Sequence, residues 1–148
     1  MILLIEDDPA DARLIQRALG KVDIPEPVLR LTNGEDAISY LRGDHPYGNR
    51  NSYPFPTLVL LDIKLPKRNG FEVLEWIRNQ RTTTRRTLVV MMTSSRHSVD
   101  VGRAYDLGVN SYLVKPESTE QLLNIAQLIK QYWLDCNEGP SVGAVRGA

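Results

Sequence analysis

The sequence lacks several features that would direct it to particular classes of protein. It has one cysteine, Cys136, in 148 residues, which excludes an internal disulfide and favours a reducing compartment. No apolar run approaches the roughly 18 residues that a membrane helix needs, and the apolar start at residues 1–5 is too short for a signal peptide. We therefore expect a cytoplasmic globular protein with no membrane partner.

An excess of charge of one sign is also missing. Lys+Arg and Asp+Glu both total 18, so the formal net charge is zero. Such a balance gives no electrostatic reason to expect direct nucleic-acid binding. The densest basic segment, residues 81–86, has three arginines in six residues and is typical of a solvated turn. We expect no direct nucleic-acid partner.

What the sequence does contain is five short apolar runs separated by helix-like stretches. The runs lie at residues 2–5, 28–31, 58–61, 88–92 and 111–114. Their hydrophobicity is continuous rather than alternating, which is typical of strands buried on both faces of a parallel sheet. Strands that alternate with helices through right-handed crossovers predict a doubly wound α/β fold.

The stretches between the runs carry helix signals. Asp8 offers an N-cap, Pro9 suits the first helical position, and Gly20 closes that helix. Ser118 and Gln121 resemble a capping box that opens the final helix. Further helices are predicted at residues 34–41, 71–77 and 99–107. The core face of the final helix is predicted to carry Leu122, Ile125, Ala126, Ile129, Trp133 and Cys136.

This pattern accounts for one domain over residues 1–137. Residues 43–56 form a long loop rich in Pro, Gly and Asn. The Gly-rich stretch at residues 138–148 is predicted to be a flexible tail. We find no internal repeat and no second domain.

Polar side chains directly follow four of the five runs. These groups, at the ends of the first, third, fourth and fifth runs, are Glu6 with Asp7, Asp62, Thr93 and Lys115. In open α/β sheets, ligands bind beyond the carboxyl ends of the strands, so we expect these side chains at one edge. A lone strand-end Asp most often caps a helix and a lone Lys is usually solvated, but neither explains all four together.

Converging carboxylates repel one another unless a hard cation neutralises them. Mg²⁺ takes oxygen ligands and typically lies beside a phosphate, and a neighbouring carboxylate can act as a nucleophile that forms an acyl phosphate. The charge on a transferred phosphoryl group is then stabilised by the metal, an ammonium and a hydroxyl. Lys115 and Thr93 are suitable groups for the last two roles.

Three functions suit such a site: a phosphorylation switch, a Mg²⁺-dependent phosphohydrolase, and a flavin or nucleotide binder. An aspartyl phosphohydrolase tends to need a second Asp two residues after its nucleophile, where this chain has Lys64. A flavin or nucleotide binder would need a Gly- or Ser/Thr-rich loop after the first strand. Here the acidic residues 6–8 would repel an anion. These observations favour the switch.

With these residues in place, the chain resembles the receiver domains of two-component response regulators. The resemblance rests on ILLIEDDPAD, LVLLDIKLPKRNGFEVL, VVMMTSS and SYLVKP, in that order, and covers nearly the whole chain. It implies a five-stranded parallel sheet in the flavodoxin-like order 2-1-3-4-5 with five helices. It also implies a phosphoacceptor switch, not a turnover enzyme, that receives its phosphoryl group from a histidine kinase and assists its own phosphotransfer and dephosphorylation.

The resemblance assigns a role to each matching position. It implies that Asp62 is the phosphoacceptor, and that Thr93 and Lys115 contact the phosphoryl group. The implied Mg²⁺ ligands are Glu6, Asp7, Asp62 and the backbone carbonyl of Lys64.

The resemblance further implies a conformational switch built from Thr93 and Tyr112, and a cis peptide bond at Lys115–Pro116. A narrower likeness, carried by the 43–56 loop, MMTSS, YDLGVNSYLVKP and the final helix, is to small stand-alone regulators of the phytochrome-associated kind. It implies a light-sensing histidine kinase as the phosphodonor.

The final helix has more apolar residues than one face requires. Beyond its core stripe it carries Leu123, Leu128, Tyr132 and Leu134. A helix that covers a sheet needs only one apolar face, and two-fold pairing is the commonest way to cover another. Cover by the Gly-rich tail and ordinary scattered surface apolar residues are the alternatives. We predict a homodimer built from the last strand and the last two helices.

Overall fold

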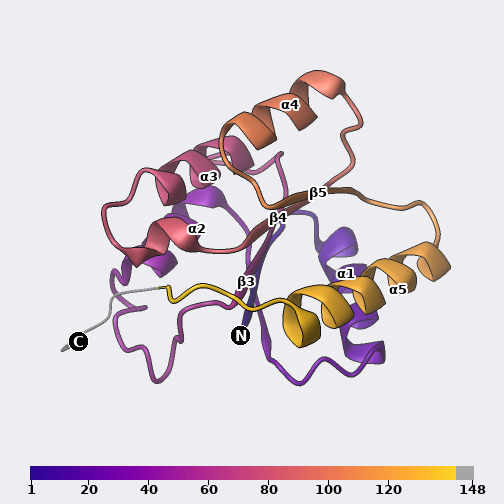
Figure 1. Cartoon of the computed structure of the whole chain (residues 1–148), viewed down its shortest axis with the longest axis horizontal. Coiled ribbons are helices and arrows are strands. Elements are labelled where there is room, and N and C mark those ends of the chain that lie inside the picture. Colours follow the sequence, from indigo (N-terminus) through magenta and orange to yellow (C-terminus); the bar gives the residue numbers. More distant parts are fainter. Residues whose placement is uncertain (143–148) are drawn as a thin grey trace.

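The computed structural model describes residues 1–142 and has alternating strands and helices (Figure 1). The strands are β1 (Ile2–Ile5), β2 (Val28–Leu31), β3 (Leu58–Leu61), β4 (Val89–Thr93) and β5 (Ser111–Val114). The α-helices are α1 (Pro9–Lys21), α2 (Gly34–Arg42), α3 (Gly70–Arg78), α4 (Ser98–Asp106) and α5 (Thr119–Leu128). A short 3-10 helix, η1 (Thr83–Arg86), follows α3, and a π-helical segment, η2 (Ile129–Cys136), continues α5.

All neighbouring strands pair in parallel, in the order β2-β1-β3-β4-β5. The predicted fold class and strand order are therefore confirmed. Every residue of β1, β3 and β4 is buried, whereas the edge strands β2 and β5 are largely half-buried. Continuous apolar runs identified the strands because helices cover both faces of this sheet.

The two faces of the sheet carry two separate cores. Odd-numbered residues of β1 pack with α2, α3 and Ala104 of α4, and even-numbered residues pack with α1, α5 and Ile129 of η2. This alternation follows from the pleat of a strand, which points successive side chains to opposite faces. Figure 1 shows α1 and α5 together on one side of the sheet and α2 and α3 on the other.

The final helix departs from the predicted core face at its end. Leu122, Ala126 and Ile129 are buried, as expected, but Cys136 is exposed, so its assignment to the core was wrong. The prediction used the 3.6-residue period of an α-helix. From Ile129 onward the chain winds as a π-helix, whose wider turn rotates later residues off the core face.

The long loop at residues 43–56 is ordered by a central arginine. Arg50 donates to the carbonyl oxygens of Tyr40 (2.9 Å), Leu41 (2.9 Å) and Tyr53 (3.3 Å). Its guanidinium also lies 5.5 Å from the centre of the Phe55 ring. The loop therefore has a fixed structure that one side chain holds from inside.

Within residues 1–142 the cis peptide bond is His45–Pro46, in this loop. The prediction of a cis bond at Lys115–Pro116 is therefore wrong. The Lys115 amide continues the β4–β5 ladder by donating to the Thr93 carbonyl at 2.7 Å, and an X–Pro bond with no contrary constraint favours the trans form.

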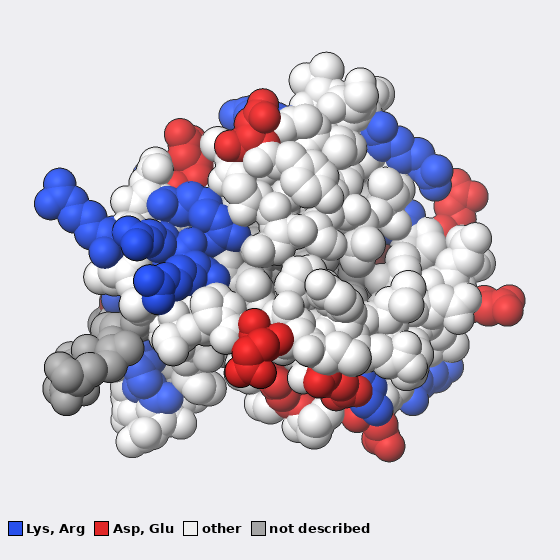
Figure 2. All heavy atoms as spheres, viewed as in Figure 1, with Lys and Arg blue, Asp and Glu red and all other residues white. Residues whose placement is uncertain are grey.

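The arginines near η1 divide into structural and exposed ones. Arg78 donates to the carbonyls of Arg85, Thr87 and Gly108, each at 2.8 Å, and so ties α3 to its neighbours. Arg81, Arg85 and Arg86 are exposed, as a solvated turn predicts. Figure 2 shows basic side chains gathered on this side of the molecule, where η1 follows α3 in Figure 1.

The predicted flexible tail begins in an irregular segment at residues 138–142, and residues 143–148 lie outside the described part of the chain. Among the described residues, no helix has the length and apolar character needed to cross a bilayer.

Candidate functional site

The loop after β1 presents two acids and is held from the neighbouring strand. The Glu6 amide donates to the Leu31 carbonyl at 3.0 Å, which extends the β1–β2 pairing by one residue. Arg30 of β2 donates to the carbonyl oxygens of Glu6 (3.0 Å) and Asp7 (3.2 Å). Glu6 is 1% exposed, whereas the Asp7 side chain is exposed. The cap predicted for α1 is confirmed, because Asp8 accepts from two amides of its first turn.

Asp62 directly follows β3, the central strand of the sheet. Its amide donates to the Ile5 carbonyl at 3.1 Å, and its Oδ1 accepts from the Ile63 amide at 2.7 Å. Gly70 makes room for this turn, since a β-carbon there would lie 2.2 Å from the Asp62 carbonyl oxygen. Sequence reasoning assigned no role to Gly70, although it lies inside the motif that contains Asp62.

Lys115 joins the acids of three elements. Its ammonium contacts Glu6 Oε1, Asp11 Oδ2 (2.9 Å) and Asp62 Oδ2 (3.0 Å). Burial alone would lower the pKa of Lys115, but the hydrogen bonds to these acids outweigh it and raise that pKa above its usual value. Lys115 is therefore charged at any physiological pH.

The acids form a group suited to a hard cation. One carboxylate oxygen from each of Glu6, Asp7 and Asp62 lies within 4.8 Å of the others. Burial raises the pKa of Glu6 to about 7; the hydrogen bond from Lys115 opposes this shift, and the Asp62 charge adds to it. An all-oxygen donor set whose members repel one another fits Mg²⁺ or a similar divalent ion. The Lys64 side chain is exposed, and its expected role rests on its backbone carbonyl.

Thr93 and Tyr112 lie beside this group, on β4 and β5. Thr93 ends β4 and is 1% exposed, and the Ser95 amide donates to its hydroxyl at 3.5 Å. Tyr112 is half-buried, and its hydroxyl donates to the Ser95 carbonyl at 3.0 Å. Burial raises the pKa of Tyr112, so the hydroxyl keeps its proton. Both predicted switch residues thus contact the backbone of Ser95 through their side-chain hydroxyls.

Two residues of this site escaped sequence reasoning. Asp11, in the first turn of α1, pairs with Lys115, and Arg30 holds the backbone of the acidic loop. Asp11 lies four residues after Asp7 on the chain, so proximity in sequence was a usable signal. Arg30 interrupts the apolar run of β2, and a charged residue inside an apolar run was a signal too.

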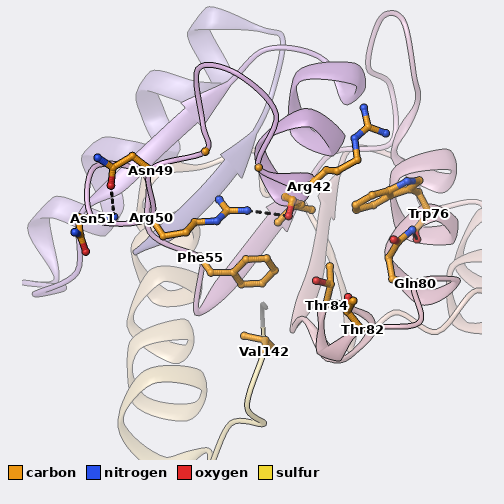
Figure 3. Close-up of a pocket in the computed structure, with 13 residues that line it drawn as sticks. Arg42, Asn49, Arg50, Asn51, Phe55, Trp76, Gln80, Thr82, Thr84 and Val142 are labelled. Atoms are coloured by element: carbon orange, nitrogen blue, oxygen red, sulfur yellow. Dashed lines mark hydrogen bonds between the residues drawn. The ribbon is translucent and has the colours of Figure 1, made fainter. Parts of the chain in front are cut away.

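A sizeable cavity lies elsewhere. It measures about 830 Å³, is built by α2, the 43–56 loop, α3 and Val142, and includes none of the predicted site residues (Figure 3). Trp76, Phe55 and Thr84 line it from different segments. Because the 43–56 loop leads into the start of β3, this cavity lies at the amino ends of the strands, whereas the acids lie at their carboxyl ends.

Comparison with known proteins agrees with the acidic site. Residues 2–127 match the response regulator receiver domain. The chain belongs to the receiver domain family. Members of this family are phosphoacceptor switches, which decides between the three functions that the sequence left open.

Individual relatives of the receiver domain cover nearly its whole length. It is 42% identical over 140 residues to the probable methanogenesis regulatory protein FilR2 of Methanothrix harundinacea, covering 95% of this chain and 87% of that one. It is 38% identical over 135 residues to the response regulator Rcp1 of Synechocystis, covering 91% and 89%. A crystal structure of the phosphorylated cyanobacterial phytochrome response regulator RcpA superposes with a TM-score of 0.86 at 39% identity, covering 95% and 97%.

A structure of Rcp1 is known in an Mn²⁺-bound form, and this receiver superposes on it with a TM-score of 0.83 at 36% identity. Receiver domains bind such ions at an acidic site, and this chain places Glu6, Asp7 and Asp62 together.

Proposed function

We propose that Asp62 accepts a phosphoryl group from the phosphohistidine of a histidine kinase, with Lys115 and Thr93 stabilising the transferred group. The observation that carries this proposal is the Lys115 ammonium, which contacts Glu6 and Asp62 inside the group of three acids. A partly buried ammonium beside a carboxylate nucleophile is placed where it can stabilise the negative charge on a phosphoryl oxygen.

In the proposed reaction, an Asp62 carboxylate oxygen attacks phosphorus, an O–P bond forms, and the P–N bond to the histidine breaks. The electron pair of that bond stays on the imidazole, which takes a proton from solvent. Hydrolysis later returns the carboxylate as water attacks the same phosphorus and inorganic phosphate leaves. The domain thus assists both reactions without turning over a separate substrate.

We assign the Mg²⁺ ligands to Glu6, Asp7, Asp62 and the Lys64 carbonyl. When bound, the ion would neutralise the acids and a phosphoryl oxygen. The chain holds these ligands in place: the Ile63 amide donates to the Asp62 carboxylate, and Arg30 donates to the backbone carbonyls of residues 6 and 7.

Replacement of Asp62 tests the acceptor. Asp62→Asn is nearly isosteric but removes the nucleophilic carboxylate, so phosphate uptake from acetyl phosphate with Mg²⁺ should be lost. Intact-mass spectrometry should show one added phosphoryl group in the wild type and none in the variant, with both proteins folded by circular dichroism. Equal uptake by the two proteins would overturn the assignment.

We propose that Thr93 and Tyr112 transmit the phosphorylated state. A phosphoryl oxygen that draws the Thr93 hydroxyl inward would disturb its contact with Ser95, to which Tyr112 also bonds. Thr93 and Tyr112 then shift the same equilibrium between two conformations, one favoured with the phosphoryl group and one without it. Thr93→Ala should be phosphorylated more slowly and should bind the downstream partner equally with and without phosphate. A normal phosphate-dependent increase in that variant would contradict the proposal.

We further propose a phytochrome as the donor kinase and the cytoplasm as the site of action. Similarity to RcpA, a cyanobacterial phytochrome response regulator, supports the donor, and a lone cysteine fits the compartment. A purified phytochrome kinase should transfer phosphate to this chain faster than an unrelated histidine kinase at equal concentration. Equal rates would remove the proposed preference.

We propose that the chain is a homodimer through β5, α4 and α5. Leu128 and Tyr132 are 62% and 57% exposed, and they border a cavity of about 340 Å³ between β5 and the final helix. This apolar area supports a contact with a second copy. Light scattering should give a dimer for the wild type and for Leu14→Glu on α1, but a monomer for Leu128→Glu. A wild-type monomer, with or without phosphate, would rule the proposal out.

A further inference from the structure

Lys115 binds a third acid that does not belong to the cation site. Asp11 Oδ2 lies 2.9 Å from the Lys115 ammonium, and its side chain is 41% exposed. The three acids that lie together are Glu6, Asp7 and Asp62, and Asp11 is outside that group. The ammonium has three N–H donors, so each of its three carboxylate partners can take one.

The position of Asp11 alone has an ordinary explanation that its contacts do not support. Acids are common in the first turn of a helix, where they favour the dipole or close a capping box. Here Asp8 provides the cap of α1, and its own amide donates to Glu6 Oε2 at 3.4 Å. The Asp11 carboxylate instead reaches across to Lys115, 104 residues further along the chain.

Phosphorylation changes the other two partners of Lys115. The Asp62 carboxylate becomes an acyl phosphate, whose negative charge lies on the phosphoryl oxygens, and Glu6 belongs to the group of acids that fits a divalent ion. Neither carboxylate then offers the ammonium the charge that it had before. A lysine side chain has several rotatable bonds and loses much entropy when it is fixed in one place, so an anchor that persists has an effect on rate. Asp11 is the carboxylate partner that is neither the proposed acceptor nor a member of that group.

We propose that Asp11 is a positioning residue for phosphotransfer: it anchors the Lys115 ammonium beside Asp62 while Glu6 and Asp62 exchange partners. This inference rests on the proposed function of Asp62 and Lys115. With one N–H on Asp11, two remain for phosphoryl oxygens. The anchor acts on the rate of transfer and leaves the cation site, to which it does not belong, unchanged.

The test compares Asp11→Asn with two controls. Asp8→Asn removes the same charge from the same helix end, retains a good capping group and does not contact Lys115. Asp11→Glu restores the carboxylate. Each protein is labelled with acetyl phosphate over a range of Mg²⁺ concentrations, and uptake is followed by intact-mass spectrometry.

Asp11→Asn should lower the maximal uptake rate about two- to fivefold, the range expected for a partly exposed ion pair. The Mg²⁺ concentration at half-maximal rate should stay the same. Asp8→Asn should match the wild type, and Asp11→Glu should recover most of the rate. Raising the ionic strength should shrink the difference between wild type and Asp11→Asn, because salt screens the anchor. If Asp11 served only to stabilise the fold, the effect of Asp11→Asn on the rate would not depend on ionic strength in this way.

Three results would overturn the inference. Asp11→Asn could match Asp8→Asn, it could label faster than the wild type, or its whole effect could be a change in the Mg²⁺ requirement. Failure of the proposed function is distinct from these, because then the wild type itself would take up no phosphate. Thermal melting of each variant checks that it is folded at the assay temperature.

Discussion

Lys115 and Arg50 make comparable contacts at opposite ends of the strands: Lys115 at the carboxyl ends and Arg50 at the amino ends. Each is a partly buried cation that holds three oxygen acceptors from different parts of the chain. Lys115 holds the carboxylates of Glu6, Asp11 and Asp62. Arg50 holds three backbone carbonyls of α2 and the 43–56 loop.

The difference lies in what the acceptors can do. A carboxylate can take a proton, bind a metal or form an acyl phosphate, so every partner of Lys115 can be altered chemically. A backbone carbonyl does none of these at ordinary pH, so the contacts of Arg50 persist as long as the loop is folded. Three contacts at the carboxyl ends of the strands can therefore change on phosphorylation or metal binding, whereas three contacts at the amino ends stay the same. Below, these two ends are called the responsive edge and the fixed edge.

The largest effect should come from removing the responsive cation. Lys115→Ala deprives the phosphoryl group of its ammonium, and loss of one such group typically slows a reaction about 100- to 1,000-fold. Phosphate uptake from acetyl phosphate with Mg²⁺ measures the rate, and Lys67→Ala, at an exposed lysine of the segment between β3 and α3, is the control. A Lys115→Ala rate within threefold of the wild type would contradict the assigned role.

Removing the fixed cation should affect stability and not activity. Arg50→Ala leaves three carbonyls without their charged donor and should cost about 2–4 kcal/mol in the free energy of unfolding, measured in urea. Phosphate uptake should match the wild type. Arg42→Ala, which breaks the exposed pair with Asp44, should change stability little. A large loss of phosphate uptake in folded Arg50→Ala would end the proposed division between the two edges.

The smallest effect should be a pH dependence that only the responsive edge has. The pKa of Glu6 is about 7 in the folded protein and 4.5 without the fold. Between these values the folded state binds a proton that the unfolded state has lost, so stability falls as pH rises from 4.5 to 7. The loss relative to Glu6→Gln should be at most about 3 kcal/mol.

Urea unfolding of metal-free protein in a chelator, at several pH values between 4.5 and 8, measures this difference. Wild type and Glu6→Gln should diverge as pH rises through the window and run parallel above it. Arg50→Ala should keep the wild-type pH dependence, because none of the carbonyls it frees titrates. Parallel curves for wild type and Glu6→Gln throughout would contradict the raised pKa.

The sequence by itself determined the strands and most of the acidic site, whereas the order of the strands came from the resemblance to receiver domains. The reason is that covered parallel strands must be apolar on both faces, and that their carboxyl ends meet at one edge. Glu6, Asp7, Asp62 and Lys115 were therefore predictable from local pattern and from the resemblance to receiver domains, and the structure brings them together.

Only the tertiary structure decided which distant groups meet. The fold placed Asp11 on Lys115 and Arg30 on the acidic loop, two contacts between groups that lie far apart in the sequence. The π-helical end of the final helix likewise moved Cys136 off the core face that an α-helical period predicts. Local sequence fixes local conformation, but a long side chain chooses among partners that only packing brings within its reach.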